Sequence, residues 1–221
     1  MRAVYLLDIN ACRIECEKIV EKLPEDLSQR VLNTANEQRR KERAFSYFLA
    51  HNLIKKSDPC DENVKISFSE SGKPYIKNSS LSISLAHSNF VAAVFISDEN
   101  EDVGIDIEAV TEKSERVSEA FLKNRIIPFD IADENNIDIF IASVCDGMDV
   151  DALKEENIFL KKELSGTDKW TYCESVLKCD GIGVCGINNI SDIIRSSSVR
   201  VLRVDINGKK YSLSVAIKKK N

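Results

Sequence analysis

The chain lacks any long apolar segment. Charged residues interrupt every apolar run before it reaches the roughly 18 residues of a membrane-spanning helix. Charge also comes early at the N-terminus, where Arg2 and Asp8 flank a short apolar stretch, and this predicts that no signal peptide is present. We therefore expect a cytoplasmic protein that makes no contact with a membrane.

The chain also lacks an excess of basic residues. Its 31 lysines and arginines are outnumbered by 36 aspartates and glutamates, which gives a formal net charge of -5. Because nucleic-acid binders need a basic face to neutralise phosphates, this balance disfavours a general nucleic-acid-binding protein. Any anionic ligand must then meet a local basic patch.

No Cys-x-x-Cys pair occurs, although the chain has seven cysteines. An odd number of cysteines spread over 221 residues does not suit a disulfide framework and favours reduced thiols. The six-residue spacing of Cys173, Cys179 and Cys185 matches no recognised zinc motif. The sequence therefore predicts neither a disulfide scaffold nor a structural zinc site.

Strand and helix patterns occur in both halves of the chain. We expect a strand at residues 4–9 and a long helix at residues 36–56, where apolar side chains recur at helical spacing. A strand at residues 81–87 places His87 on the same face as its apolar side chains. A hairpin with an Asn207-Gly208 turn follows near the end. This mixture predicts an α/β (α+β) fold.

A polar connection at residues 97–102 could join two lobes. We therefore expect an N-terminal lobe at residues 1–101 and a C-terminal lobe at residues 102–221, which together form one functional unit. Residues 125–164 fit strand, helix or a cover over a cleft, and they are assigned no chemical role.

The segment from Val103 to Glu108 points most directly to chemistry. Its β-branched residues alternate, which predicts a strand. Gly104, Asp106 and Glu108 then share one face of this strand. Two carboxylates on one face suit Mg²⁺ bound to a phosphorylated substrate. Glycine on that face leaves room for a bulky neighbour. The pattern alone also fits a half-buried strand with a solvated acidic face.

Four short motifs follow one another along the chain. They are Gly72-Lys73-Pro74, Leu85-Ala86-His87-Ser88, Gly104-Ile105-Asp106-Ile107-Glu108, and the predicted helix from Trp170 to Lys178. Their order and wording resemble the 4′-phosphopantetheinyl transferases, specifically the larger two-lobed members of the surfactin type. In that family the motifs read G-K-P, S-H-S, G-[IV]-D-[IVL]-E and W-x-x-K-E-[SA]-x-x-K.

The resemblance implies a pseudo-twofold fold of two similar lobes, each a small sheet packed on helix, with coenzyme A and Mg²⁺ between them. It implies transfer of the 4′-phosphopantetheine arm of coenzyme A to a serine of an acyl or peptidyl carrier protein, with release of 3′,5′-ADP. Such carriers serve fatty acid, polyketide or nonribosomal peptide biosynthesis. We expect coenzyme A and a carrier protein as partners of a monomer.

The resemblance also assigns roles to individual residues. Glu174 completes the metal-binding carboxylates with Asp106 and Glu108, or acts as the base for the attacking serine, and Lys178 holds a phosphate oxygen. Further contacts to coenzyme A are expected from Lys73, His87, Ser88, Arg39, Arg40 and Arg43. Guanidinium groups suit phosphate geometry, which favours the arginines for the 3′-phosphate.

Each of these residues also has a simpler interpretation. Glu174 and Lys178 are four apart, so they also fit an exposed helix pair worth about 0.2–0.5 kcal/mol. His87 also fits a hydrogen-bonded core histidine. The arginines also fit the polar face of an amphipathic helix.

Cys173 departs from the family pattern, because it stands where the fourth motif has its first lysine. The periodicity places it at the edge of the expected cleft, and the change removes a positive charge that would act in the transition state. Three outcomes stay open: a slow enzyme, compensation by Lys169 or Lys178, and a relative without activity. The long spacing from Glu108 to Trp170 predicts an insertion within residues 125–164.

Two other classes of function use the same residues. One is a Mg²⁺-dependent phosphohydrolase with water as the nucleophile, and the other is a non-catalytic relative that binds coenzyme A or a carrier protein. A Cys173–His87 nucleophilic couple is conceivable, but the sequence offers no third group to orient the base.

Overall fold

The computed structural model describes residues 1–57, 65–132, 137–144, 148–155 and 158–220. Its helices are α1 (Cys16–Lys22), α2 (Glu25–Leu32), α3 (Glu37–Ser57), α4 (Glu112–Leu122), α5 (Gly166–Asp180), the 3-10 helix η1 (Val184–Asn189) and α6 (Ile190–Ile194). Its strands are β1 (Arg2–Asp8), β2 (Lys65–Phe68), β3 (Pro74–Lys77), β4 (Ser82–Ser88), β5 (Val91–Ser97), β6 (Glu101–Ala109), β7 (Asp138–Val144), β8 (Val150–Lys154), β9 (Phe159–Leu160), β10 (Ser198–Ile206) and β11 (Lys209–Lys219).

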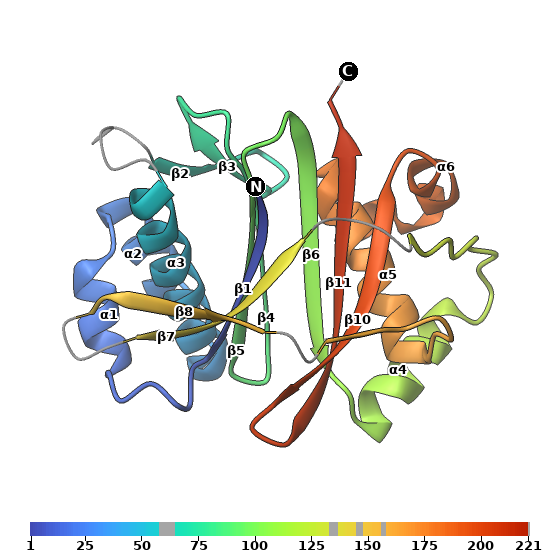
Figure 1. Cartoon of the computed structure of the whole chain (residues 1–221). Helices are drawn as coiled ribbons and strands as arrows, with labels where there is room; N and C mark the ends of the chain where they lie inside the picture. The colour runs from blue at the N-terminus through green and yellow to red at the C-terminus, as the bar shows by residue number, and fades with distance from the viewer. Residues whose placement is uncertain (58–64, 133–136, 145–147, 156–157, 221) are drawn as a thin grey trace.

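The elements form layers, which Figure 1 shows nearly edge-on. Helices α1 to α3 cover one face of a sheet with strand order β4-β5-β1-β7-β8, and the other face of that sheet meets a second sheet with order β6-β11-β10-β9. Helix α5 covers the far face of the second sheet, and α4 and α6 pack against α5. The chain thus has a mixed α/β fold, as the sequence predicted.

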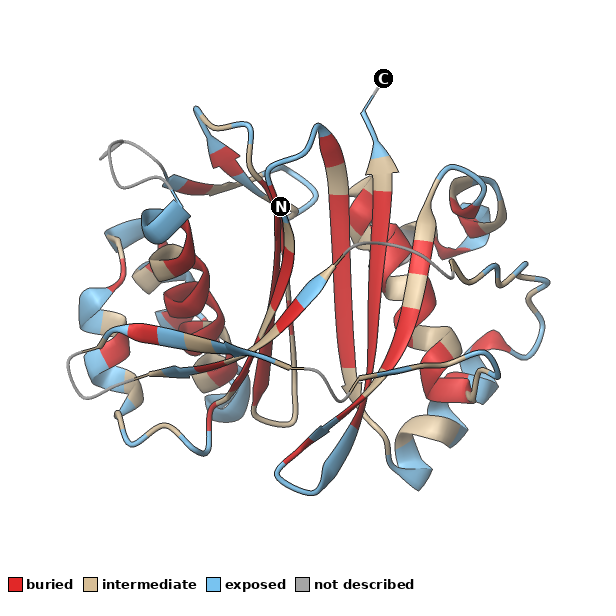
Figure 2. Cartoon of the chain, viewed as in Figure 1, coloured by how far each residue is buried: buried red, intermediate tan, exposed pale blue. Residues whose placement is uncertain are grey.

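Apolar side chains fill the space between each pair of layers. Alternate residues of β1 face opposite sides of the first sheet. Leu7 packs in the core under α3, whereas Val4 and Leu6 pack in the core between the two sheets. Figure 2 shows the resulting buried stripes along β1, β6 and β11. Along the described chain, no helix combines the length and the apolar character needed to cross a membrane.

Residues 125–164, which the sequence left unassigned, contribute β7, β8 and β9 where the structure describes them. Strand β7 pairs in parallel with β1, and β8 pairs antiparallel with β7. The expected boundary at residues 101 and 102 falls at the start of β6, yet β7 and β8 extend the sheet formed by the first half. This part of the chain therefore contributes strands to both sheets, β7 and β8 to the first and β9 to the second.

Serine side chains join the two sheets where β4 and β6 lie side by side. The backbone N–H of Ile105 donates to Ser84 Oγ at 3.1 Å, and the N–H of Ala109 donates to Ser88 Oγ at 3.3 Å. Both N–H groups lie on the edge of β6 that is not paired with β11. The serines thus satisfy backbone donors that would otherwise be buried without partners.

Helix α5 approaches β6 most closely at Gly104. A Cβ atom at this position would lie 1.9 Å from the carbonyl oxygen of Ser175 and 2.5 Å from the backbone nitrogen of Cys179. Gly104 therefore faces α5, while Val103 and its apolar neighbours at alternate positions pack toward the first sheet. The alternation predicted for this strand is confirmed, and glycine is required because backbone occupies the Cβ position.

We expect Gly104→Ala to lower the free energy of unfolding by about 3 kcal/mol, the upper range for overpacking a core. In an open strand, the same change would normally be favourable. Urea denaturation measures the effect. Gly208→Ala is the matched control, since no atom lies within 4 Å of its Cβ position and only its positive φ opposes the change, at a cost of about 1 kcal/mol. Equal losses for both variants would contradict the close contact.

Candidate functional site

The N-terminus of α5 is held by a buried polar network. Ser165 and Asp168 form a capping box, in which Ser165 Oγ accepts from the Asp168 N–H and the Asp168 carboxylate accepts from the Ser165 N–H. The carboxylate of Asp168 is fully buried and also accepts from Arg203 at 2.9 Å and from Ser212 at 2.7 Å. On the α4 side, Glu115 accepts from Ser165 Oγ at 2.7 Å. These bonds fix α5 on the second sheet before any ligand binds.

With α5 fixed in this way, Lys178 near the end of this helix forms an ion pair with Asp106 of β6. Its Nζ donates to Asp106 Oδ1 at 2.6 Å, and the side chains of Lys178 and Asp106 are 29% and 7% exposed. The second oxygen, Asp106 Oδ2, is buried and has no hydrogen-bond partner within the described chain. A buried carboxylate oxygen without a partner is costly, so it marks a place where a ligand could bind.

Two further carboxylates face the same place, and we call Asp106, Glu108 and Glu174 the carboxylate cluster. Burial raises the pKa of Glu108 to about 7, and the negative charge of Asp106 adds to this shift. Burial likewise raises the pKa of Glu174, again with a contribution from Asp106. Burial alone would lower the pKa of Lys178, but the three carboxylates outweigh it and raise that pKa. One lysine thus faces three mutually repelling acids.

The residues of the cluster fit a divalent cation. Hard oxygen ligands suit Mg²⁺, and a divalent charge would relieve the repulsion among the carboxylates. The free Oδ2 of Asp106 offers the first ligand. Among the described side chains, no three of His, Cys, Asp and Glu already stand at metal-ligand spacing. Binding an ion would therefore require Glu108 or Glu174 to turn toward Asp106.

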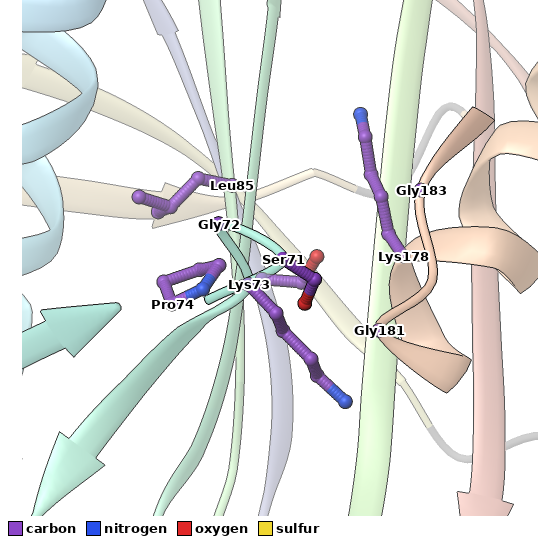
Figure 3. Close-up of a pocket in the computed structure, with 9 residues that line it drawn as sticks. Ser71, Gly72, Lys73, Pro74, Leu85, Lys178, Gly181 and Gly183 are labelled. Carbon is purple, nitrogen blue, oxygen red and sulfur yellow. The ribbon is translucent and has the colours of Figure 1, made fainter. Parts of the chain in front are cut away.

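A cavity of about 140 Å³ lies between the turn before β3 and the end of α5 (Figure 3). Lys73 and Lys178 both line it, together with Gly181 and Gly183 on the α5 side. Lys73 Nζ donates to the backbone oxygen of Cys179 at 2.5 Å and to Asp102 Oδ1 at 3.1 Å. Lys73 thus caps the C-terminus of α5, where a cation is favoured.

A larger cavity of about 720 Å³ lies on the other side of the cluster. Arg39, Ser88 and Glu108 line its polar part, and Phe121 and Trp170 line its apolar part. Those two aromatic rings pack edge to face with centroids 4.9 Å apart. Ser88 Oγ donates to Glu108 Oε2 at 2.8 Å and so orients that carboxylate. Glu108 of the cluster thus lines the larger cavity, and Lys178, the partner of Asp106, lines the smaller one.

The three arginines of α3 do not share one role. Arg39 lines the larger cavity, as a ligand-binding residue would. Arg40 donates to the backbone oxygen of Thr34 at 2.9 Å, and Arg43 donates to the hydroxyl of Thr34 at 2.8 Å. Arg40 and Arg43 thus brace the connection between α2 and α3, and neither lines the two cavities beside the cluster.

His87 bonds to a residue that the sequence analysis did not select. Its Nδ1 lies 3.0 Å from Oε2 of Glu42, which is buried on α3. Helical spacing holds a signal for Glu42, since Phe45 and Leu49 follow it by three and seven positions on the apolar face. A charged residue on that face is expected only where a polar partner is buried with it.

Cys173 does not lie at a cleft edge, and that expectation was wrong. The side chain is fully buried in the apolar core around α5, in the same cluster as Tyr172, Val176 and Leu177. Burial raises the pKa of its thiol to about 12, with a further contribution from Glu174. Lys169 lies over the ring of Phe129, with Nζ 5.9 Å from the centroid. Lys178 therefore supplies the positive charge beside the cluster.

The cysteine chemistry considered from the sequence finds no support in these contacts. A thiol with a pKa near 12 is protonated at neutral pH and is a poor nucleophile. Cys12, Cys16, Cys173 and Cys179 are free thiols, whereas Cys60, Cys145 and the side chain of Cys185 lie outside the described residues. The predicted reduced state agrees with the cysteines that are described.

Comparisons with known proteins add no family to these observations. A scan against models of protein families found none that matches this chain, and a search of curated proteins found no match. The motifs and the geometry of the carboxylate cluster are therefore the features that bear on function.

We expect Lys178→Met to lower the free energy of unfolding by about 3 kcal/mol at neutral pH, the lower end for a buried pair because Lys178 is 29% exposed, since Asp106 would stay buried without its cation. Adding Asp106→Asn should recover most of this loss, since the amide carries no charge. Urea denaturation of the single and double variants measures the coupling. Lys73→Met is the control, because its partner Asp102 is 38% exposed and such pairs contribute about 1 kcal/mol at most. Additive losses for Lys178 and Asp106 would contradict the buried pair.

We expect Cys173→Ala to lower the free energy of unfolding by about 1 kcal/mol, as a small cavity in the core does. Cys173→Lys should cost at least about 3 kcal/mol, since an unpaired ammonium would be buried. Thermal and urea unfolding of both variants give the comparison. A Cys173→Lys protein as stable as the parent would show that this position opens onto the cleft after all.

Proposed function

We propose that the protein transfers the 4′-phosphopantetheine arm of coenzyme A to a serine of an acyl or peptidyl carrier protein. The observation that carries this proposal is the convergence of Asp106, Glu108 and Glu174 on Lys178, with one Asp106 oxygen that no described residue bonds. This arrangement can bind a metal and a phosphate group together, which breaking a phosphoanhydride requires.

The order of the motifs and the layout of the fold also support the proposal. Two sheets, each packed on helices, agree with a two-lobed transferase-like fold. The Gly72-Lys73-Pro74 turn and the strand end at His87-Ser88 lie against the same site from the first half of the chain. Residues far apart in the sequence therefore line the two cavities beside Lys178 and Glu108, which supports a ligand site there.

The proposed metal is Mg²⁺, held by Asp106 and Glu108, with Glu174 either as the third ligand or as the base for the serine, and it would neutralise phosphate charge when bound. Lys178 contacts the β-phosphate region and absorbs charge as the phosphoanhydride breaks. Further cations line the two cavities, Lys73 the smaller one and Arg39 and Lys113 the larger one.

In the reaction, the carrier serine oxygen forms a bond to the β-phosphorus of coenzyme A, and the bond to the oxygen of 3′,5′-ADP breaks. The serine proton passes to a carboxylate. Glu174 is suited to this role, because its raised pKa makes it a stronger base than a solvated glutamate. Trp170 and Phe121 offer an apolar wall for the pantetheine arm or for the carrier beside it.

Two other functions use the same carboxylates. A phosphohydrolase would release 3′,5′-ADP from coenzyme A without a carrier, whereas a non-catalytic binder would release none. The non-catalytic alternative rested on Cys173 replacing a lysine at the cleft edge, but Cys173 is fully buried. Lys178 provides a cation beside Asp106. The structure gives no specific reason to prefer either alternative.

We expect Asp106→Asn to reduce carrier-dependent release of 3′,5′-ADP by at least about 100-fold, the scale for losing a group that stabilises transition-state charge. Asp106 is buried rather than solvated, so unfolding must be measured alongside turnover. Asp102→Asn is the matched control, because Asp102 lies on the same strand and pairs with Lys73 instead. Unchanged turnover in Asp106→Asn would remove the metal assignment.

A further inference from the structure

Glu42 is a buried acid on α3 whose two oxygens have different partners. It is 3% exposed. Its Oε1 accepts from the backbone N–H of Phe90 and from Gln38 Nε2, both at 2.9 Å. Its Oε2 lies 3.0 Å from Nδ1 of His87. The first two bonds therefore hold the carboxylate so that the second oxygen faces the imidazole.

The charge of Glu42 is maintained by these bonds. Burial on its own would raise the pKa of Glu42, but the hydrogen bonds from His87, Gln38 and the Phe90 N–H outweigh it and lower that pKa to about 2. The carboxylate is ionised at neutral pH and can only accept hydrogen bonds. Nδ1 of His87 must therefore carry the hydrogen in this contact.

The other ring nitrogen of His87 remains available. No group of the described chain donates to or accepts from Nε2, and the His87 side chain is 29% exposed. On the same strand, Leu85 lines the smaller cavity and Ser88 lines the larger one. His87 also acts electrostatically on Asp106. His87 is not among the residues that line either cavity, so this electrostatic effect on Asp106 is what links it to the carboxylate cluster.

We propose that Glu42 is a positioning residue that holds His87 with its Nδ1–H toward α3, so that Nε2 is the ring atom presented to a phosphate oxygen of the substrate. The contact of Nε2 with a phosphate rests on the proposed function, whereas the position of the hydrogen on Nδ1 does not. A phosphate oxygen only accepts, so Nε2 also carries a proton in the complex, and the Glu42 carboxylate stabilises the cation that results. A carboxylate behind a ligand-binding histidine acts in this way at other sites.

Glu42→Gln tests the geometry with a side chain of the same shape. Its carbonyl oxygen keeps the two donors Phe90 N–H and Gln38, which leaves the new amide NH₂ against Nδ1 of His87. Nδ1 must then accept, so the hydrogen moves to Nε2. The substitution is therefore expected to invert the tautomer while the fold is retained.

Ring ¹H–¹⁵N spectra can read this directly, because the chain contains only two histidines. In the parent protein at pH 8 we expect the Nδ1–H form for His87, and in Glu42→Gln we expect the Nε2–H form. His51 lies on the same helix as Glu42 and serves as the internal control, with an unchanged pattern. The same His87 pattern in both proteins would overturn the positioning role.

A binding cycle tests the consequence for the ligand, with 3′,5′-ADP as the probe in calorimetry. We expect Glu42→Gln and His87→Ala each to raise the dissociation constant about tenfold, and the double variant to bind no more weakly than His87→Ala alone. Additive losses would overturn the proposal, since Glu42 would then act without His87. Glu101→Gln controls for the loss of a buried acid, because Glu101 is 1% exposed and pairs with Arg2 instead.

The two readouts separate this inference from the proposed function. If the parent protein binds neither 3′,5′-ADP nor coenzyme A, the proposed function and the phosphate contact both fail, while the histidine spectra still decide whether Glu42 sets the tautomer. If binding is normal and the tautomer does not change in Glu42→Gln, only the positioning role fails.

Discussion

The contact between α5 and β6 at Gly104 is the constraint on which the site depends. Because the helix backbone fills the space of a Cβ atom, α5 lies close enough for Lys178 to reach Asp106 at 2.6 Å. A side chain at residue 104 would move the helix outward and separate Lys178 from the carboxylates. The capping network at Ser165 and Asp168 fixes the other end of α5. The position of the site is thus set by backbone packing.

A second constraint joins the two sheets at β4 and β6. The hydroxyl groups of Ser84 and Ser88 accept from the backbone of β6, and Ser88 also donates to Glu108. One residue therefore contributes to the junction of the sheets and to the orientation of a carboxylate. This sharing explains why groups from both halves of the chain meet at one place, where three acids face a single lysine.

Much of this arrangement could be predicted from local patterns. Alternation along residues 103–108 gave the correct face for Asp106 and Glu108, and helical spacing placed Glu174 and Lys178 together. The pairing of β7 with β1 could not be predicted, because a parallel contact between distant segments leaves no local pattern. The depth of Cys173 and the partner of His87 depend on how α5 and α3 pack, which spacing alone does not determine.

The central claim is that this site moves phosphopantetheine from coenzyme A to a carrier protein. The most direct measurement is the intact mass of an apo carrier protein after incubation with this protein, coenzyme A and Mg²⁺. The account predicts a carrier heavier by one phosphopantetheine group, with none added when its acceptor serine is replaced by alanine. A folded protein that leaves the mass of apo acyl and peptidyl carriers unchanged would contradict the account.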